Sequence, residues 1–215
     1  MTSPFFQIWI KHKEQLSQLT NFPIDTKISS FSWSPSGSSL ISVVNTELVN
    51  VYLDKEIKRI PLNFAVLNIY QWRDNNEVLL KVRKAGQPQL IKFNLVTDEL
   101  KTLLIEEVKW AVNTESGQLM YLDHDNVFWM TDDNKTKSIN KLENQFGSKR
   151  FVFEKGHIYG INNDKELWRY TPKIDVFKVL QKMDTYTHFV SDIEEPELLL
   201  TQIIAAKQEV VVLKD

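Results

Sequence analysis

Residues Phe31-Ser32-Trp33-Ser34-Pro35-Ser36-Gly37-Ser38-Ser39-Leu40 join an aromatic strand to an apolar strand through a turn that contains proline and glycine. Proline presets φ and glycine tolerates positive φ, so this turn predicts a hairpin. Comparable aromatic-bearing starts recur roughly every forty residues, at 30–35, 68–73, 108–112, 150–154 and 187–191. A period of this length built of short strands predicts propeller blades.

A second landmark recurs at the same period, an apolar strand that opens on a polar residue. Its equivalent positions are Ile8, Val49, Leu90, Val127, Leu167 and Val210. Weaker strands follow all but the last, at 15–20, 56–62, 99–105, 136–142 and 176–183. Four strands per unit is the make-up of a propeller blade. We therefore predict an all-β fold, a β-propeller of about five four-stranded blades.

The predicted propeller occupies residues 1–215 as a single domain. Its blades are expected at 28–62, 66–105, 107–142, 149–183 and 186–215, after a partial blade at 1–20. Because third strands outnumber first strands by one, the chain is expected to begin inside a blade, as a fragment of a longer, incomplete propeller would. The alternative is that the N-terminal hairpin packs as an extra edge. An open strand edge predicts self-association.

Composition excludes several classes of function. The 26 basic and 28 acidic residues are spread through the chain and give a net charge of -2, so direct nucleic-acid contact by this segment is not expected. Cysteine is absent, which excludes disulfides, thiolate metal sites and a cysteine nucleophile. No run approaches the roughly 18 apolar residues of a membrane span, so membrane contact is expected only through an upstream anchor.

Candidate catalytic and metal-binding residues are better explained as parts of turns and strands. The histidines lack the short spacing of zinc ligands; they are His12, His124, His157 and His188. The cluster Asp123-His124-Asp125 and the serines of 36–39 could contribute to a hydrolase site, but a Gly-x-Ser-x-Gly elbow is missing. The acidic turns at 132–134 and 194–197 do not fit a calcium loop.

We therefore predict no catalytic, cofactor-binding or metal-binding residue, no cofactor and no enzymatic activity. Ligand-binding and partner-binding residues are not identified by the sequence. The tryptophans of the first strands and of the third strands are expected to fill the core between blades rather than to form a sugar or cation cage. They are Trp33, Trp72, Trp110, Trp9, Trp129 and Trp168.

Two stretches carry a family resemblance. Residues 31–40 resemble the FSWSPDGKKLAF signature of TolB-type, WD-repeat-like propellers, with Ser36 where that family usually has Asp. Residues 7–10 through 18–20 resemble the IWIVDLDGGEPRQLT ending of the same repeats. The chain is also similar in style to the C-terminal propellers of ToxR/CadC-type membrane-anchored transcriptional regulators, in which a periplasmic sensor follows a winged helix and one membrane span.

This resemblance implies a non-catalytic, periplasmic interaction or sensory module that meets a protein or small-molecule signal at the propeller rim. Two other interpretations stay open, a stand-alone TolB-like scaffold and the propeller cap of a prolyl-oligopeptidase-like hydrolase. A cytoplasmic location is the alternative to the periplasm, because a cysteine-free chain suits both.

Overall fold

The computed structural model describes residues 6–12, 15–74, 76–132, 135–194, 197–204 and 207–213. The chain divides into two compact units, residues 1–107 and 108–215, and each is described by itself. Both units consist of antiparallel sheets, together with two short 3₁₀ helices in the second unit. The described residues contain no helix long and apolar enough to cross a membrane.

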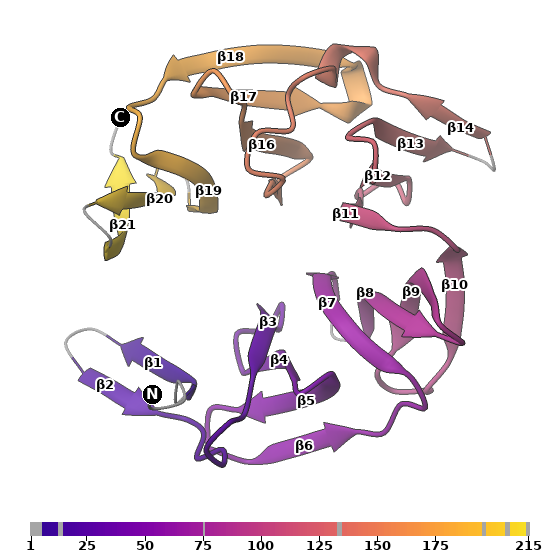
Figure 1. The fold of residues 1–215 in the computed structure, drawn as a ribbon, viewed down its shortest axis with the longest axis vertical. Coiled ribbons are helices and arrows are strands. Elements are labelled where there is room, and N and C mark those ends of the chain that lie inside the picture. The colour runs from indigo at the N-terminus through magenta and orange to yellow at the C-terminus, as the bar shows by residue number, and fades with distance from the viewer. Residues whose placement is uncertain are drawn as a thin grey trace. The chain divides into compact units, whose positions relative to one another are not determined.

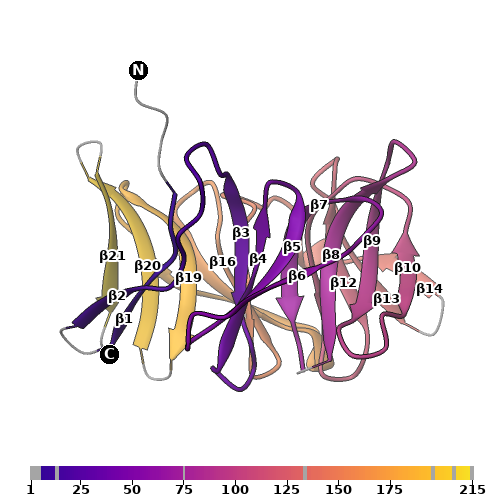
Figure 2. The ribbon, with the colours of Figure 1, turned by 90° about the horizontal axis from the view of Figure 1, so that it is seen from below.

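The first unit holds a hairpin and two four-stranded sheets, in which each strand pairs with the next along the chain (Figure 1). The hairpin is β1 (Trp9–His12) with β2 (Gln15–Gln18). Blade 1 comprises β3 (Ile28–Trp33), β4 (Ser39–Val44), β5 (Glu47–Tyr52) and β6 (Ile57–Ile60), and Figure 2 shows these strands from the side. Blade 2 comprises β7 (Ala65–Trp72), β8 (Glu77–Lys84), β9 (Gln87–Asn94) and β10 (Leu100–Leu104).

The second unit follows the same plan. Blade 3 comprises β11 (Val108–Asn113), β12 (Leu119–Asp123), β13 (Phe128–Asp132) and β14 (Lys135–Ser138). Blade 4 comprises β15 (Val152–Glu154), β16 (His157–Ile161), β17 (Glu166–Thr171) and β18 (Val176–Lys182). A three-stranded sheet comprises β19 (Thr187–Glu194), β20 (Glu197–Ile204) and β21 (Lys207–Leu213). The helices are η1 (Asn140–Leu142) and η2 (Pro172–Ile174).

The predicted all-β propeller is confirmed, because four successive sheets have the four antiparallel strands of a blade. The sheet β19–β21 has three strands and the hairpin β1–β2 has two among the described residues, so four blades are complete where about five were predicted. The single domain spanning residues 1–215 stays a prediction.

Matching turns join the first and second strands of blades 1 and 3. Gly37 and Gly117 take φ of 69° and 84°, which is why glycine stands at the fourth position of each turn. The hydroxyl oxygens of Ser34 and Thr114 accept hydrogen bonds from backbone N–H groups at the start of the next strand, Ser39 N at 3.1 Å and Gln118 N at 3.1 Å. The polar side chain at the first position of each turn therefore stabilises the turn by a hydrogen bond across it.

In the first unit, apolar side chains of blades 1 and 2 share one core. Blade 1 contributes Ile41, Val43 and Leu48, and the buried residues of blade 2 pack on them: Val66, Ile69, Trp72, Val78, Leu80, Val82, Ile91 and Phe93. The strands β3 and β7 are also joined directly, because the Ser30 hydroxyl accepts a hydrogen bond from the Ile69 amide at 3.1 Å. Ser30 therefore belongs to the face that blade 1 turns toward blade 2.

In the second unit, an aromatic core joins blades 3 and 4. The Trp110 indole donates a hydrogen bond to the Phe151 carbonyl at 3.1 Å, and their rings meet edge to face at 5.2 Å. Trp168 is fully buried beside Phe151, with ring centroids 5.6 Å apart. Edge-to-face pairs at such separations stabilise beyond the area they bury.

Candidate functional site

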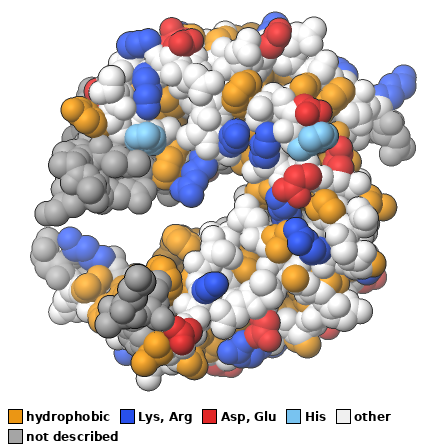
Figure 3. All heavy atoms as spheres, viewed as in Figure 1, with side chains coloured by type: hydrophobic (Ala, Val, Ile, Leu, Met, Phe, Trp, Pro, Cys, Tyr) orange, Lys and Arg blue, Asp and Glu red, His pale blue; other side chains and the backbone are white. Residues whose placement is uncertain are grey.

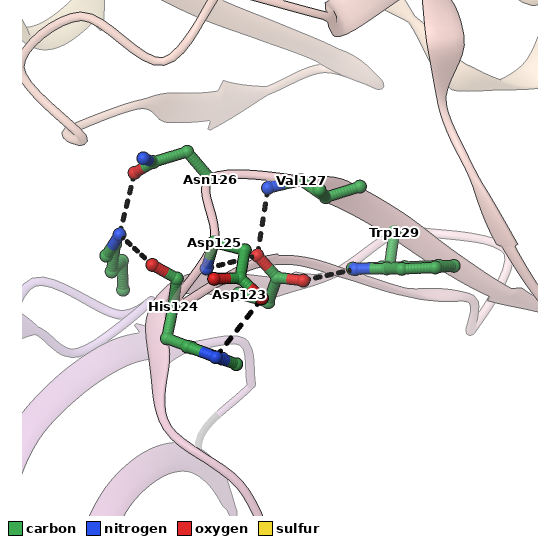
Figure 4. A network of polar contacts seen from close by, with 7 residues as sticks. Asp123, His124, Asp125, Asn126, Val127 and Trp129 are labelled. Atoms are coloured by element: carbon green, nitrogen blue, oxygen red, sulfur yellow. Dashed lines mark hydrogen bonds and ion pairs between the residues drawn. The ribbon is translucent and has the colours of Figure 1, made fainter.

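The polar turn between β12 and β13 is the strongest cluster of chemistry-bearing residues that the sequence suggests (Figure 4). Its centre is Asp123, which is only 7% exposed. One carboxylate oxygen accepts the backbone N–H groups of Asp125 at 2.8 Å and Val127 at 2.9 Å, and the other accepts the indole N–H of Trp129 at 2.7 Å. Asp123 therefore stabilises the hairpin, since its carboxylate satisfies three donors.

The remaining groups of this turn point outward. His124 Nε2 lies 3.1 Å from Asp125 Oδ2, and both side chains are largely exposed. Lys109 donates to Asn126 Oδ1 at 2.7 Å and to the His124 carbonyl oxygen. The imidazole thus pairs with an exposed carboxylate, as the interpretation of a solvated turn predicts. The cluster has the geometry of a hairpin turn that is stabilised by hydrogen bonds to Asp123.

The candidate serines bond to one another. In the first unit the hydroxyls of Ser34 and Ser36 are 3.2 Å apart, and those of Ser36 and Ser38 are 2.7 Å apart. A hydroxyl activated for nucleophilic attack needs a base within hydrogen-bond reach. The only partners recorded for the Ser36 hydroxyl within the described segments are serine oxygens and the Ser38 amide.

The histidines whose side chains the structure describes, His124, His157 and His188, do not come together as metal ligands, and the side chain of His12 lies outside the described part of the chain. No three His, Asp or Glu side chains of the described residues form a possible metal site. His157 Nδ1 lies 2.8 Å from Thr171 Oγ1 in the sheet of blade 4, and His188 on β19 is partly exposed. Of the two acidic turns, positions 133–134 and 195–196 lie outside the described residues.

The tryptophans differ in burial, which the sequence did not predict, and Trp129 on β13 is only partly buried. Trp72, Trp110 and Trp168 are buried, as expected. Trp33 and Trp9 are not core residues: their side chains are 43% and 52% exposed. Trp33 lies opposite Leu40, on the face of blade 1 turned away from blade 2.

That face is only partly covered. Residues of the hairpin β1–β2 and its flanks pack on the middle strands β4 and β5 of blade 1 and on Ile28 at the start of β3. The cluster comprises Ile8, Ile10, Leu19, Phe22, Ile28, Leu40, Val44, Val49 and Val51. The innermost strand β3 keeps Phe31 65% exposed beside Trp33. We define Phe31 and Trp33 as the aromatic pair. In the sequence, serine and aromatic residues alternate over positions 30–33, which indicates that the two aromatic side chains share one face of the strand.

A cavity of about 550 Å³ lies in the first unit, between blade 1 and the start of β7. It is lined by Thr46, Glu47, Arg59, Ile60, Pro61, Leu62, Phe64 and Ala65. Arg59 is paired with Glu47 across the cavity wall. The two charged side chains that line this cavity are therefore paired with each other.

Asp175 connects η2 to neighbouring elements of the second unit. Its carboxylate lies 2.8 Å from Lys141 Nζ and accepts a hydrogen bond from the Tyr170 hydroxyl at 2.8 Å. The interaction with Lys141, and then that with Tyr170, lowers the pKa of Asp175 below its usual range. Burial, and then Asp175 itself, raise the pKa of Tyr170. Charged groups elsewhere are mixed: on the face in Figure 3, basic and acidic side chains are interspersed.

No protein-family model matches the chain, and no curated protein matches it. Solved structures match its fold. TolB from Acinetobacter baumannii is 14% identical with a TM-score of 0.60, over 90% of this chain and 55% of that one. The tricorn protease is 12% identical with a TM-score of 0.60, over 83% of this chain and 20% of that one.

A third similar structure is described as the extracellular domain of a one component system from B. thetaiotaomicron. It is 11% identical with a TM-score of 0.58, over 91% of this chain and 29% of that one. This chain therefore spans a fifth of the tricorn protease and about half of TolB. At these identities the likeness shows the fold: the chain has a TolB-like β-propeller fold.

Proposed function

We propose that this protein is a non-catalytic interaction module that recognises a protein or small-molecule signal through the aromatic pair. The observation that carries the proposal is the exposure of Phe31 and Trp33 on a first strand. Their counterparts on β7, Ile69 and Trp72, are 6% and 9% exposed. Exposed neighbouring aromatic side chains on a rigid strand are typical of recognition surfaces, because they bury much apolar area with little loss of conformational freedom.

The wider role that fits this surface is the extracytoplasmic sensor region of a membrane-anchored transcriptional regulator. The resemblance of residues 31–40 to TolB-type repeats and the fold shared with an extracellular domain of a one component system support it. In this role the protein lies in the periplasm and does not itself contact nucleic acid. A stand-alone TolB-like scaffold would use the same surface. Regulator and scaffold differ in whether the aromatic pair affects transcription.

The interaction is tested by site-specific photo-crosslinking. A photoreactive phenylalanine analogue replaces Phe31 or Trp33 in the full-length protein in its host cell, and replaces Val96 as a control. Val96 is an exposed apolar residue of the same unit, at 70% exposure. We expect a discrete crosslinked product at positions 31 and 33 and none at 96. The same products at all three positions, or none at any, would refute the proposal.

The regulatory role is tested with a matched pair of double variants in the chromosomal gene. Phe31→Ser with Trp33→Ser removes the aromatic pair, whereas Val96→Ser with Ile105→Ser removes two other exposed apolar side chains of the same unit. Changes at exposed positions alter the free energy of unfolding by about 0.5 kcal/mol or less. For a regulator, the transcript profile changes only with the first variant. For a scaffold, both variants keep the profile and only the first loses the crosslinked product.

An enzyme, such as a prolyl-oligopeptidase-like hydrolase, is the competing class, because the fold is shared with the tricorn protease. Purified protein is incubated with ester and peptide substrates. We expect no turnover above background. Turnover abolished by a single Ser or His substitution would overturn the non-catalytic role.

A further inference from the structure

We infer that the outer edge of β18 in blade 4 binds an extended acidic segment of a partner protein as a fifth strand. The strand runs over seven residues, Val176–Lys182, compared with four or five residues for the outer strands β6, β10 and β14. It pairs with β17 along one edge, and no pairing along its other edge is present among the described residues. An unpaired edge of this length presents a row of free backbone donors and acceptors.

The side chains around this edge are apolar and basic. Val176, Val179 and Leu180 are 46%, 42% and 37% exposed, and the preceding Ile174 is 65% exposed. The strand itself contains two lysines and no acidic residue. By contrast, β14 carries only lysine, threonine and serine, all exposed. The β18 edge therefore combines apolar surface that a partner strand can bury with charges of one sign.

The register of the sheet places one lysine of β18 beside a positive charge of β17. Lys178 of β18 lies directly opposite Arg169 of β17, and an ion pair is recorded for neither within the described segments. Like charges directly opposite one another destabilise a sheet, and an opposite charge across a strand pair stabilises it. A carboxylate on an added strand, placed opposite Lys178, would offset this repulsion.

Lysines on an edge also discourage unwanted pairing. Here the two effects act together: a neutral or basic strand must bury Lys178 against its own backbone, whereas an acidic strand pairs with it. Lys182 already has partners, because it lies opposite Glu166 and donates to the Asp164 carbonyl oxygen. A second copy of the chain presents the same lysines at its own β18, so edge-to-edge pairing of two copies is disfavoured. The edge is therefore selective for an extended segment that alternates acidic and apolar residues.

The test uses two fluorescently labelled, end-capped octapeptides added to the purified chain. One peptide alternates valine with glutamate, and the other alternates valine with lysine. We expect saturable binding of the glutamate peptide, with no saturation by the lysine peptide. Lys178→Glu should weaken binding about 3- to 10-fold, because the variant replaces a favourable cross-strand pair with a like-charged one. Lys58→Glu, a change on the outer strand β6 of the first unit, should leave binding unchanged.

Strand addition is distinguished from loose ionic attraction by the peptide backbone. Two further glutamate peptides are N-methylated, one at odd and one at even positions, which keeps the charge but removes every second N–H donor. Binding should be abolished for the peptide whose methyl groups replace the N–H donors that face β18, and kept for the other. Amide hydrogen exchange should slow within residues 176–182 when the peptide binds. Equal weakening by Lys178→Glu and Lys58→Glu, or protection confined to other segments, would overturn the inference. Removal of the aromatic pair should not affect this binding, which separates the result from the proposed function.

Discussion

Replacement of Gly160 by alanine tests the packing of the core between blades 3 and 4. An alanine Cβ at this position of β16 would lie 2.5 Å from Trp168 Cζ2 and 2.6 Å from Phe151 Cδ1. Carbon atoms prefer separations of about 3.5–4.0 Å, so at least one ring must shift by roughly 1 Å. Trp168 cannot turn away freely, because it is fully buried with Phe128, Phe151 and Phe177 around it.

The expected loss follows from two opposing effects. Overpacking of a dense core costs about 1–3 kcal/mol, and the smaller entropy of the unfolded alanine chain offsets about 0.4–1 kcal/mol of this. The mid-range values, about 2 and about 0.7 kcal/mol, leave a net destabilisation of about 1.3 kcal/mol, which lowers the melting temperature by about 3–5 °C for a chain of this size. Thermal and urea unfolding followed by circular dichroism measure both quantities, and the urea m-value should stay unchanged.

A double-mutant cycle identifies the cause. Trp168→Phe removes the ring edge that the new methyl group meets, so Gly160→Ala should cost at least about 0.5 kcal/mol less in that background. Gly86→Ala is the control: its Cβ meets no atom within 4 Å, and its cost arises from a φ of 78° alone. That cost should not depend on Trp168. A Gly160→Ala variant as stable as the parent, or an additive cycle, would refute the reasoning.

Two further predictions concern the polar contacts of the second unit. Asp123→Ala leaves the amides of Asp125 and Val127 and the Trp129 indole without their acceptor. The variant should therefore lower the free energy of unfolding, measured by urea titration, by about 1–3 kcal/mol. The exposed Asp125→Ala is the control, and an equal loss of stability in both variants would contradict the prediction. Asp175 has a lowered pKa in the folded chain, so its ionised form stabilises the fold above the ordinary carboxyl pKa, and this stability is lost as the pH falls through the lowered value. The difference in free energy of unfolding between the parent and Asp175→Asn should therefore shrink as the pH falls from about 6 to about 2. A difference that stays constant over that range would show that the ionised carboxylate does not contribute to stability.

Much of the strand order follows from local chemistry. The alternating aromatic starts and the polar turns at 34–37 and 114–117 predict hairpins because each turn residue has a defined conformational role, and these hairpins are present. The solvated-turn interpretation of Asp123-His124-Asp125 also agrees with the structure, except that Asp123 is buried and braces the turn. Asp and Asn are frequent in turns, but burial depends on Trp129 from the next strand.

The direction of the tryptophan side chains could not be predicted from spacing. A bulge changes which residues of a strand share a face, and the pairing of the first strands shifts register between Ile28 and Ser30 in blade 1 and between Val108 and Trp110 in blade 3. Blade 2 contains two such shifts. The exposure of Trp33 depends further on the packing of the N-terminal hairpin, which covers Val49 and Val51 but leaves Phe31 and Trp33 exposed. Neither effect leaves a periodic signal in the chain.

The opposite packing of the first-strand tryptophans of blades 2 and 3 has a consequence for the exchange of blades. Trp72 of blade 2 packs toward the blade that precedes it, whereas Trp110 of blade 3 packs toward the blade that follows it. A chimera that inserts blade 3 in place of blade 2 would therefore direct its indole away from the Ile41–Val43 surface and leave that surface without a large partner. The repeats share a length but are not interchangeable modules, and engineering of this scaffold has to treat each pair of adjoining blades as one part.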